Sequence, residues 1–175
     1  MNTQHTTKKV IIKDIYLRLT QLFSTEDIVI VGGVSLLLTC DKNRKLGDID
    51  VTMNPKLLLN VSGRIAQFNG FIPEYDKDEL MALVDKQTDI EIETKAKNCN
   101  TMNKVLGLPA PTKSKPTILG LPLKEVIENA MILDVNGVKI RIPSRVHQII
   151  MKYNLWLFRA CYLYPRGIFH RCPFL

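Results

Sequence analysis

The segment over residues 28–53 constrains the fold of this chain more than any other part of its sequence. Its β-branched run, Ile28 to Val31, is typical of a buried strand and ends in the pair Gly32-Gly33. Asp48-Ile49-Asp50 follows after a charged stretch. It alternates polar and apolar residues, as a strand with one exposed and one buried face does. We therefore expect, in order, a strand over 28–31, a glycine turn, a short helix over 34–39, a charged loop over 41–47 and a strand over 48–53.

The rest of the chain predicts an α/β (α+β) fold, in which a mixed β-sheet carries helices mainly on one face. Asn136-Gly137 predicts a type I′ hairpin, and Ser144 is the expected N-cap of the helix that follows. The stretch 98–122 holds four prolines and no clear period, so we expect a long surface loop there. The further expected helices cover 8–23, 55–68 and 145–158, and the further expected strands cover 80–84, 87–94, 131–134 and 138–142.

Length and composition favour one soluble domain. A chain of 175 residues can bury a substantial core, and we expect one domain over residues 1–159. The tail over 160–175 has no period and stays unassigned; a truncated or irregular end would leave part of a ligand site missing. No apolar stretch is long enough to span a bilayer, and no secretory signal is visible at the N-terminus. Four cysteines without metal-binding spacing then predict reduced thiols and a cytoplasmic protein.

The positive charge is unevenly distributed. The formal net charge is +7, and the chain from Lys139 to its end carries basic residues and no acid. One interpretation is a solvated basic face. The other is a surface that meets phosphate, on a nucleotide or a nucleic acid.

The two aspartates favour a metal site. Residues at i and i+2 of a strand share a face about 6.5–7 Å apart, so Asp48 and Asp50 present two carboxylates in one direction. A divalent cation such as Mg²⁺ or Mn²⁺ relieves their repulsion and gains oxygen ligands. Pairs of this kind also occur by chance on solvent-facing strand edges.

The glycine pair predicts a phosphate-binding turn next to the metal site. A strand that ends at Gly32-Gly33 and turns into a helix exposes backbone N–H groups, which form a site for phosphate. Ser35, in the first turn, is expected to add its hydroxyl. The alternative is a plain turn. A dinucleotide-binding fingerprint is disfavoured, because G-x-G-x-x-G needs a third glycine and this segment lacks it.

A third carboxylate is expected on the strand over 87–94. Ile90 and Ile92 point to one side of that strand, and its acids point to the other. The acids on that face are Asp89, Glu91 and Glu93, and the candidates for the third carboxylate are Asp89 and Glu91. In the alternative interpretation this acidic face is solvated and pairs with Lys86 or Lys95.

These motifs together resemble the nucleotidyltransferase superfamily that includes DNA polymerase β, and more narrowly its minimal, toxin-like AbiEii-type branch. The resemblance rests on Val31-Gly32-Gly33, on Asp48-Ile49-Asp50-Val51 and on the basic pair Arg44-Lys45 upstream of the acids. It implies catalytic, metal-binding carboxylates at Asp48, Asp50 and Asp89, with Glu91 as the second choice for the third position.

The resemblance also implies the ligands and the reaction. Gly32, Gly33 and Ser35 would bind the nucleotide phosphates, and Lys152 would offset their charge, unless its side chain simply lies along the helix surface. The expected function is metal-dependent transfer of an NMP group from an NTP, such as ATP, to a hydroxyl of a small molecule, a protein or an RNA. The alternative is a catalytically inactive module on the same fold that binds a nucleotide or nucleic acid.

Overall fold

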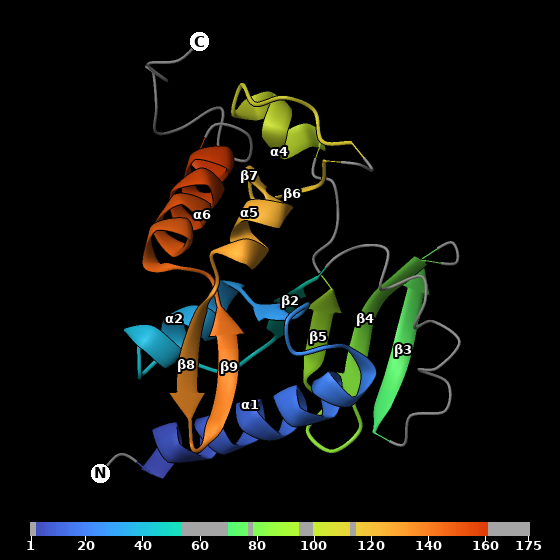
Figure 1. The fold of residues 1–175 in the computed structure, drawn as a ribbon, viewed down its shortest axis with the longest axis vertical. Coiled ribbons are helices and arrows are strands. Elements are labelled where there is room, and N and C mark those ends of the chain that lie inside the picture. Colours follow the sequence, from blue (N-terminus) through green and yellow to red (C-terminus); the bar gives the residue numbers. More distant parts are fainter. Residues whose placement is uncertain (1–2, 54–69, 77–78, 95–99, 113–114, 161–175) are drawn as a thin grey trace.

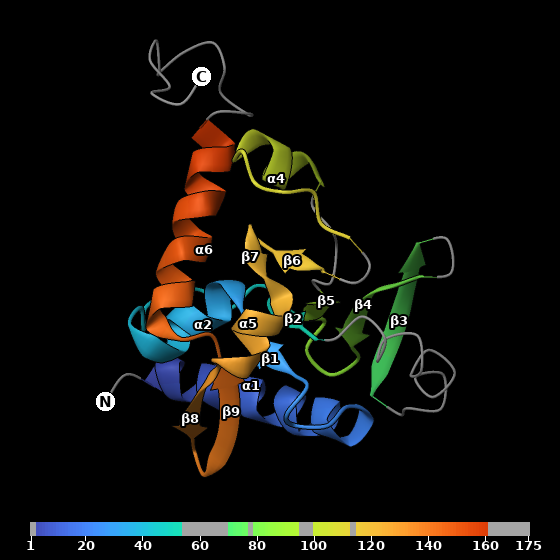
Figure 2. The same cartoon turned by 45° about the horizontal axis from the view of Figure 1, so that its top comes forward.

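The structure, a computed structural model, describes residues 3–53, 70–76, 79–94, 100–112 and 115–160. Figures 1 and 2 place helix α1 at one end of the molecule and helices α4, α5 and α6 at the other, with a β-sheet between them. Within the described residues, no helix has the length and apolar character needed to cross a bilayer. The expected helix over 55–68 and the tail over 161–175 lie outside the described residues.

Helix α1 (Thr3–Leu22) is the long amphipathic helix that the sequence predicts, and it begins a few residues earlier than expected. Its apolar residues recur three or four positions apart, which places them on one face. That face is buried in the main core, and it carries Ile12, Ile15, Tyr16 and Leu19. The opposite face is exposed, so α1 covers one side of the sheet.

The central sheet has five strands in the order β1-β2-β5-β4-β3, which confirms a mixed α/β fold. Strands β2 and β5 are parallel, and the other neighbouring pairs are antiparallel. The strands are β1 (Val29–Ile30), β2 (Ile49–Thr52), β3 (Phe71–Asp76), β4 (Glu79–Asp85) and β5 (Glu91–Thr94). Strand β3 was not predicted, because Pro73 interrupts its pattern; proline is tolerated there since β3 lies at the edge of the sheet.

Strand β1 separates two apolar cores. Ile28 and Ile30 belong to the main core, which α1 covers. Val29 and Val31 point to the other side and pack in a second core with residues from α5 and α6. This alternation follows from the period of two along a strand, and it buries the run from 28 to 31 on both faces, as its uninterrupted apolar sequence predicts.

The stretch over 98–122 is more regular than the expected surface loop. It contains helix α4 (Asn100–Val105) and the short antiparallel strands β6 (Thr117–Ile118) and β7 (Leu121–Pro122). Met102, Asn103 and Ile118 are buried. Elements this short give no visible period in the sequence, so the prediction of a long surface loop was wrong for these residues.

The hairpin and the last described helix agree with the sequence. After helix α5 (Leu123–Glu128) come β8 (Met131–Val135) and β9 (Val138–Ile142), joined by Asn136 and Gly137 with φ of 52° and 83°. Both values are positive, as a type I′ turn requires. Helix α6 (Arg145–Phe158) follows, and the Ser144 hydroxyl accepts a hydrogen bond from the N–H of His147, as an N-cap should.

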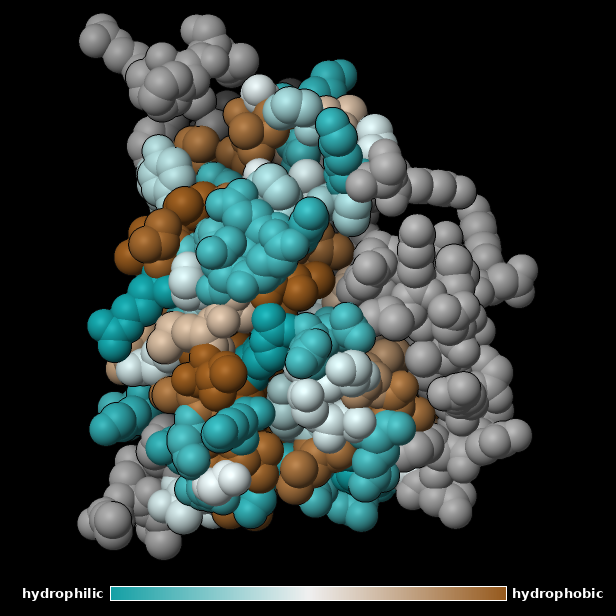
Figure 3. All heavy atoms as spheres, in the orientation of Figure 1, coloured by the Kyte–Doolittle hydropathy of each residue, from teal (hydrophilic) through white to brown (hydrophobic). Residues whose placement is uncertain are grey.

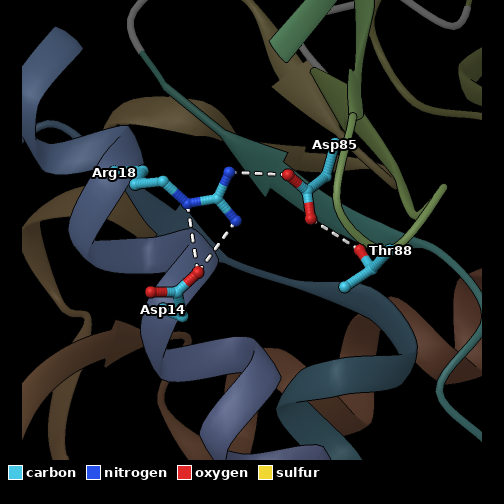
Figure 4. Close-up of polar contacts among 4 residues, drawn as sticks. All are labelled: Asp14, Arg18, Asp85 and Thr88. Carbon is cyan, nitrogen blue, oxygen red and sulfur yellow. Dashed lines mark hydrogen bonds and ion pairs between the residues drawn. The ribbon is translucent and has the colours of Figure 1, made fainter. Parts of the chain in front are cut away.

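A buried ion pair ties α1 to the end of β4 (Figure 4). Nη1 of Arg18 donates to Oδ1 of Asp85 over 2.6 Å, and Thr88 donates to the other oxygen over 2.6 Å. The Arg18 guanidinium also contacts the exposed Asp14 and lies 4.9 Å from the centre of the Phe71 ring. Burial alone would raise the pKa of Asp85, but the bonds from Arg18 and Thr88 outweigh it and hold that pKa below its ordinary value.

We predict that Arg18→Met destabilises the fold by about 3 kcal/mol at neutral pH, because it leaves the buried Asp85 carboxylate without its ion pair. The matched control is Asp14→Asn, which removes the exposed partner of the same guanidinium and should cost less than about 1 kcal/mol. Urea unfolding of both variants measures the difference. Equal losses in the two variants would contradict this assignment.

The same pair predicts a pH dependence. The pKa of Asp85 is lower in the folded chain than its unfolded value of about 3.9, so the stability it contributes is present above that pH and is lost as the pH falls through the folded pKa. In Arg18→Met, burial no longer meets an opposing charge and should raise the pKa of Asp85. Protonation then relieves the unpaired charge in the variant, whereas it breaks the ion pair in the wild type, so we expect the stability difference between the two to narrow as the pH falls, in urea unfolding repeated across the acid range.

Candidate active site

The parallel register of β2 and β5 brings two carboxylates together. Asp50 lies directly opposite Glu93, and the preceding residues, Ile49 and Ile92, are likewise paired. Because side chains alternate along both strands, both isoleucines point into the main core and both acids point to the other face of the sheet. The acids therefore lie on the face that α1 does not cover.

Asp48 completes a cluster of three carboxylates. One oxygen of each of Asp48, Asp50 and Glu93 lies within 4.8 Å of the other two. Asp50 is buried, Glu93 is half-buried and Asp48 is exposed, so the cluster opens to solvent on the Asp48 side. Carboxylates this close repel one another, and a divalent cation with a preference for oxygen ligands offsets that repulsion. The expectation that Asp48 and Asp50 share one direction agrees with this geometry.

The third member of the cluster is Glu93, and the expected residue Asp89 is not part of it. Strand β5 begins at Glu91, whereas Asp89 lies in the preceding turn with φ of 55° and an exposed side chain. Its N–H donates to the Asp85 carbonyl over 2.9 Å, which closes that turn. The turn after β4 is thus longer than the two residues expected, and it takes Asp89 out of the strand.

Glu91 is also outside the cluster, although it shares a strand face with Glu93. Glu91 pairs with Val84 of β4 and comes two residues before Glu93, which is the residue that pairs with Asp50 of β2. Alternation alone makes Glu91 and Glu93 equivalent, and only the pairing with β2 distinguishes them. The sequence predicts the strand and the face on which the third carboxylate lies. The pairing register with β2, which selects Glu93, cannot be read from the sequence.

The turn from β1 into helix α2 (Gly32–Thr39) packs directly against Asp50. Gly32 has φ of +66°, and a methyl group on its Cα would overlap the Asp50 carboxylate. The N–H of Val31 donates to the Asp50 carbonyl over 2.8 Å, which fixes β1 and β2 at this level. Glycine is therefore required at position 32 for two reasons, its backbone conformation and the approach of the carboxylate.

The N-terminus of α2 lies between an acid and a base. The side chain of the N-cap residue Val31 makes no capping hydrogen bond, and N–H groups at a helix N-terminus attract anions. At the next residue, a methyl group on Gly33 would lie 2.9 Å from Nε of Arg44. Lys8 of α1 donates to the carbonyl of Arg44 over 2.8 Å and anchors the loop that carries it. The turn therefore has a carboxylate beside Gly32 and a guanidinium beside Gly33.

The other two expected nucleotide-binding residues lie elsewhere. The Ser35 hydroxyl is buried and donates to the carbonyl of Gly32 over 2.9 Å, so it is engaged within its own helix. Lys152 lies on α6 and lines an open pocket of about 520 Å³ beside the C-terminal half of α2, and the glycines do not line that pocket. The pocket residues are Leu36, Thr39, Cys40, Arg145, Gln148, Ile149 and Lys152.

The fold has a structural counterpart among solved proteins. No protein-family model matches the chain, and no curated protein matches its sequence. The chain is similar in structure to a Thermotoga maritima protein described as a "putative nucleotidyltransferase", with a TM-score of 0.54 and 13% sequence identity, over 89% of this chain and 92% of that one. At this identity the likeness concerns the fold alone: the mixed α/β arrangement with a five-stranded mixed sheet matches the structure of that protein.

Proposed function

We propose that this protein is a metal-dependent nucleotidyltransferase that moves an NMP group from an NTP to a hydroxyl acceptor. The observation that carries the proposal is the register of β2 and β5, which sets Glu93 opposite Asp50 and within reach of Asp48. The fold likeness to the Thermotoga maritima protein supports it. The order of Gly32-Gly33, Arg44-Lys45 and Asp48-Ile49-Asp50 supports the minimal, toxin-like AbiEii-type branch in particular.

The three carboxylates suit Mg²⁺ or Mn²⁺. Oxygens on opposite sides of one Mg²⁺ are about 4.2 Å apart, and the cluster oxygens lie within 4.8 Å of one another, so a small adjustment of side chains brings them to a metal. The metal would supply charge neutralisation at the phosphates and a more acidic acceptor hydroxyl. In this proposal Glu93 takes the place that the sequence assigned to Asp89.

The residues around the cluster divide the remaining work. Asp50 is held by its burial and by the contact with Gly32, so its carboxylate is fixed before substrate arrives. The N–H groups at Gly32 and Gly33 would donate to phosphate oxygens, and Arg44, beside Gly33, would offset phosphate charge. Ser35 would support this turn through its bond to Gly32. Lys152 would contact only a part of the substrate that reaches the pocket beside α6.

The decisive test is label transfer from an α-³²P-labelled NTP with Mg²⁺ or Mn²⁺, in the presence of RNA, protein and small-molecule hydroxyl acceptors. We expect Asp50→Asn and Glu93→Gln each to lower transfer by about 100-fold or more, because each removes a charge aimed at the metal. Asp89→Asn is the matched control: it neutralises an acid next to the same strand but outside the cluster, and should leave transfer within about twofold of the wild type.

Two outcomes of these experiments would contradict the proposal. If Asp89→Asn abolishes transfer and Glu93→Gln does not, the cluster is not the catalytic site. If the wild type transfers no label, and binds NTP or RNA equally well without metal and with Glu93→Gln, the protein is a binding module. Calorimetric titration of NTP with and without Mg²⁺ gives that second measurement independently of the acceptor.

The glycine turn gives a separate prediction. Gly32→Ala should destabilise the fold by about 1–3 kcal/mol, because it combines a positive φ with an overlap at Asp50. It should also weaken metal-dependent NTP binding by displacing that carboxylate. Gly33→Ala is the matched control, since its methyl group meets only the end of the flexible Arg44 side chain and should cost less than about 1 kcal/mol. Thermal unfolding and NTP titration of both variants would show the difference; equal effects would contradict it.

A further inference from the structure

We propose that the exposed face of α6 binds an acidic α-helical segment of a partner protein. The face carries four large, mostly apolar side chains that are more than half exposed to solvent: Val146, Ile149, Tyr153 and Trp156, at 64%, 69%, 52% and 54%. In Figure 3, hydrophobic spheres reach the surface on the side where Figure 1 draws α6. We call these four residues the α6 stripe.

The spacing of the α6 stripe is that of a coiled-coil seam. Its members are three, four and three positions apart, which are the a and d positions of a heptad repeat and lie along one side of a helix. The rings of Tyr153 and Trp156 contact each other with centroids 6.0 Å apart. Exposed apolar residues in a surface patch of this kind mark sites of interaction, whereas scattered ones need no explanation.

A row of basic residues borders the α6 stripe. Arg145, Lys152 and Arg159 are seven positions apart, so all three occupy the same heptad position, next to the a residues. The pocket between α2 and α6 runs along this border, because Arg145, Ile149 and Lys152 all line it. The face therefore offers an apolar seam, a positive edge and an adjacent hollow of about 520 Å³ that can receive a side chain.

This combination selects the occupant by charge and shape. Neither α6 nor the sequence after it contains an acid, so a second copy of α6 or the chain's own C-terminal residues would bring no complementary charge. A flat membrane surface leaves the hollow unfilled. Nucleic acid would neutralise the basic row and could stack bases on Tyr153 and Trp156, but it would leave the exposed Val146 and Ile149 without an apolar partner. A helix with apolar residues at heptad spacing and Asp or Glu beside them matches all three features.

Trp156 provides the measurement, because it is the chain's one tryptophan. The probe is a synthetic 21-residue helical peptide with Leu at a and d and Glu at e and g. Titration of the full chain should shift Trp156 emission to shorter wavelength, and added NaCl should weaken the binding. The same peptide with Lys in place of Glu should bind at least about tenfold more weakly, a difference of about 1.4 kcal/mol.

Matched variants locate the binding. Ile149→Ala should weaken the acidic peptide at least about tenfold, whereas Ile132→Ala, which changes a residue of similar exposure on β8, should have no effect. Arg145→Glu and Arg159→Glu should each weaken it, whereas Lys139→Glu on β9 should not. Circular dichroism of each variant checks that α6 is intact, so that a loss of binding is not a loss of fold.

Several results would overturn the proposal. Equal binding of the acidic and basic peptides, no binding of either, or equal effects of Ile149→Ala and Ile132→Ala would each do so. A wavelength shift caused by vesicles containing anionic lipid or by single-stranded RNA, without one from the acidic peptide, would assign the face to those ligands instead. Emission that is already that of a buried indole, or that depends on protein concentration as a dimer forms in sedimentation, would show that the chain covers its own stripe.

Discussion

The parallel pairing of β2 with β5 is the constraint on which the candidate site depends. The acids do not hold this pairing, because they repel one another; the apolar residues between them do. Ile49, Val51 and Ile92 are completely or almost completely buried in the main core. A slip by one residue would turn these side chains to the opposite face, and the cost of exposing them fixes the register. The carboxylate cluster is therefore positioned by the hydrophobic core on the other face of the sheet.

The glycine turn positions helix α2 relative to the carboxylate cluster. Register sets Asp50 along the sheet, and Gly32 lets α2 begin directly against its carboxylate. The buried pair of Arg18 and Asp85 holds α1 to the sheet at the far end of β4, next to the turn that leads into β5. Helix α1 therefore anchors two segments next to the candidate site. Lys8 holds the loop of Arg44, and Arg18 holds the end of β4 before the turn into β5.

Much of the fold followed from local patterns, and the failures were failures of non-local information. The alternation of 48–53, the hairpin at Asn136-Gly137 and the helix after Ser144 are decided by neighbours in sequence, and all three appear in the structure. The choice of Glu93 over Glu91 is decided by which residue of β5 faces Asp50, and Asp89 is excluded because the turn before β5 is longer than expected; no local pattern encodes either. Among the short elements within 98–122, β6 is held by non-local packing, because its Ile118 is buried in the second core with Val29, Val31 and Met151.

Both edges of the five-stranded sheet are closed, by different means. Strand β1 has only two residues and packs beside β9, so it offers little backbone to another chain. Strand β3 contains Pro73, which has no N–H to donate, and a register irregularity between Glu74 and Tyr75. Such edges resist the strand-to-strand growth that leads to aggregation. Another chain would therefore find little backbone to pair with at either edge of this sheet, so binding there would depend on side chains.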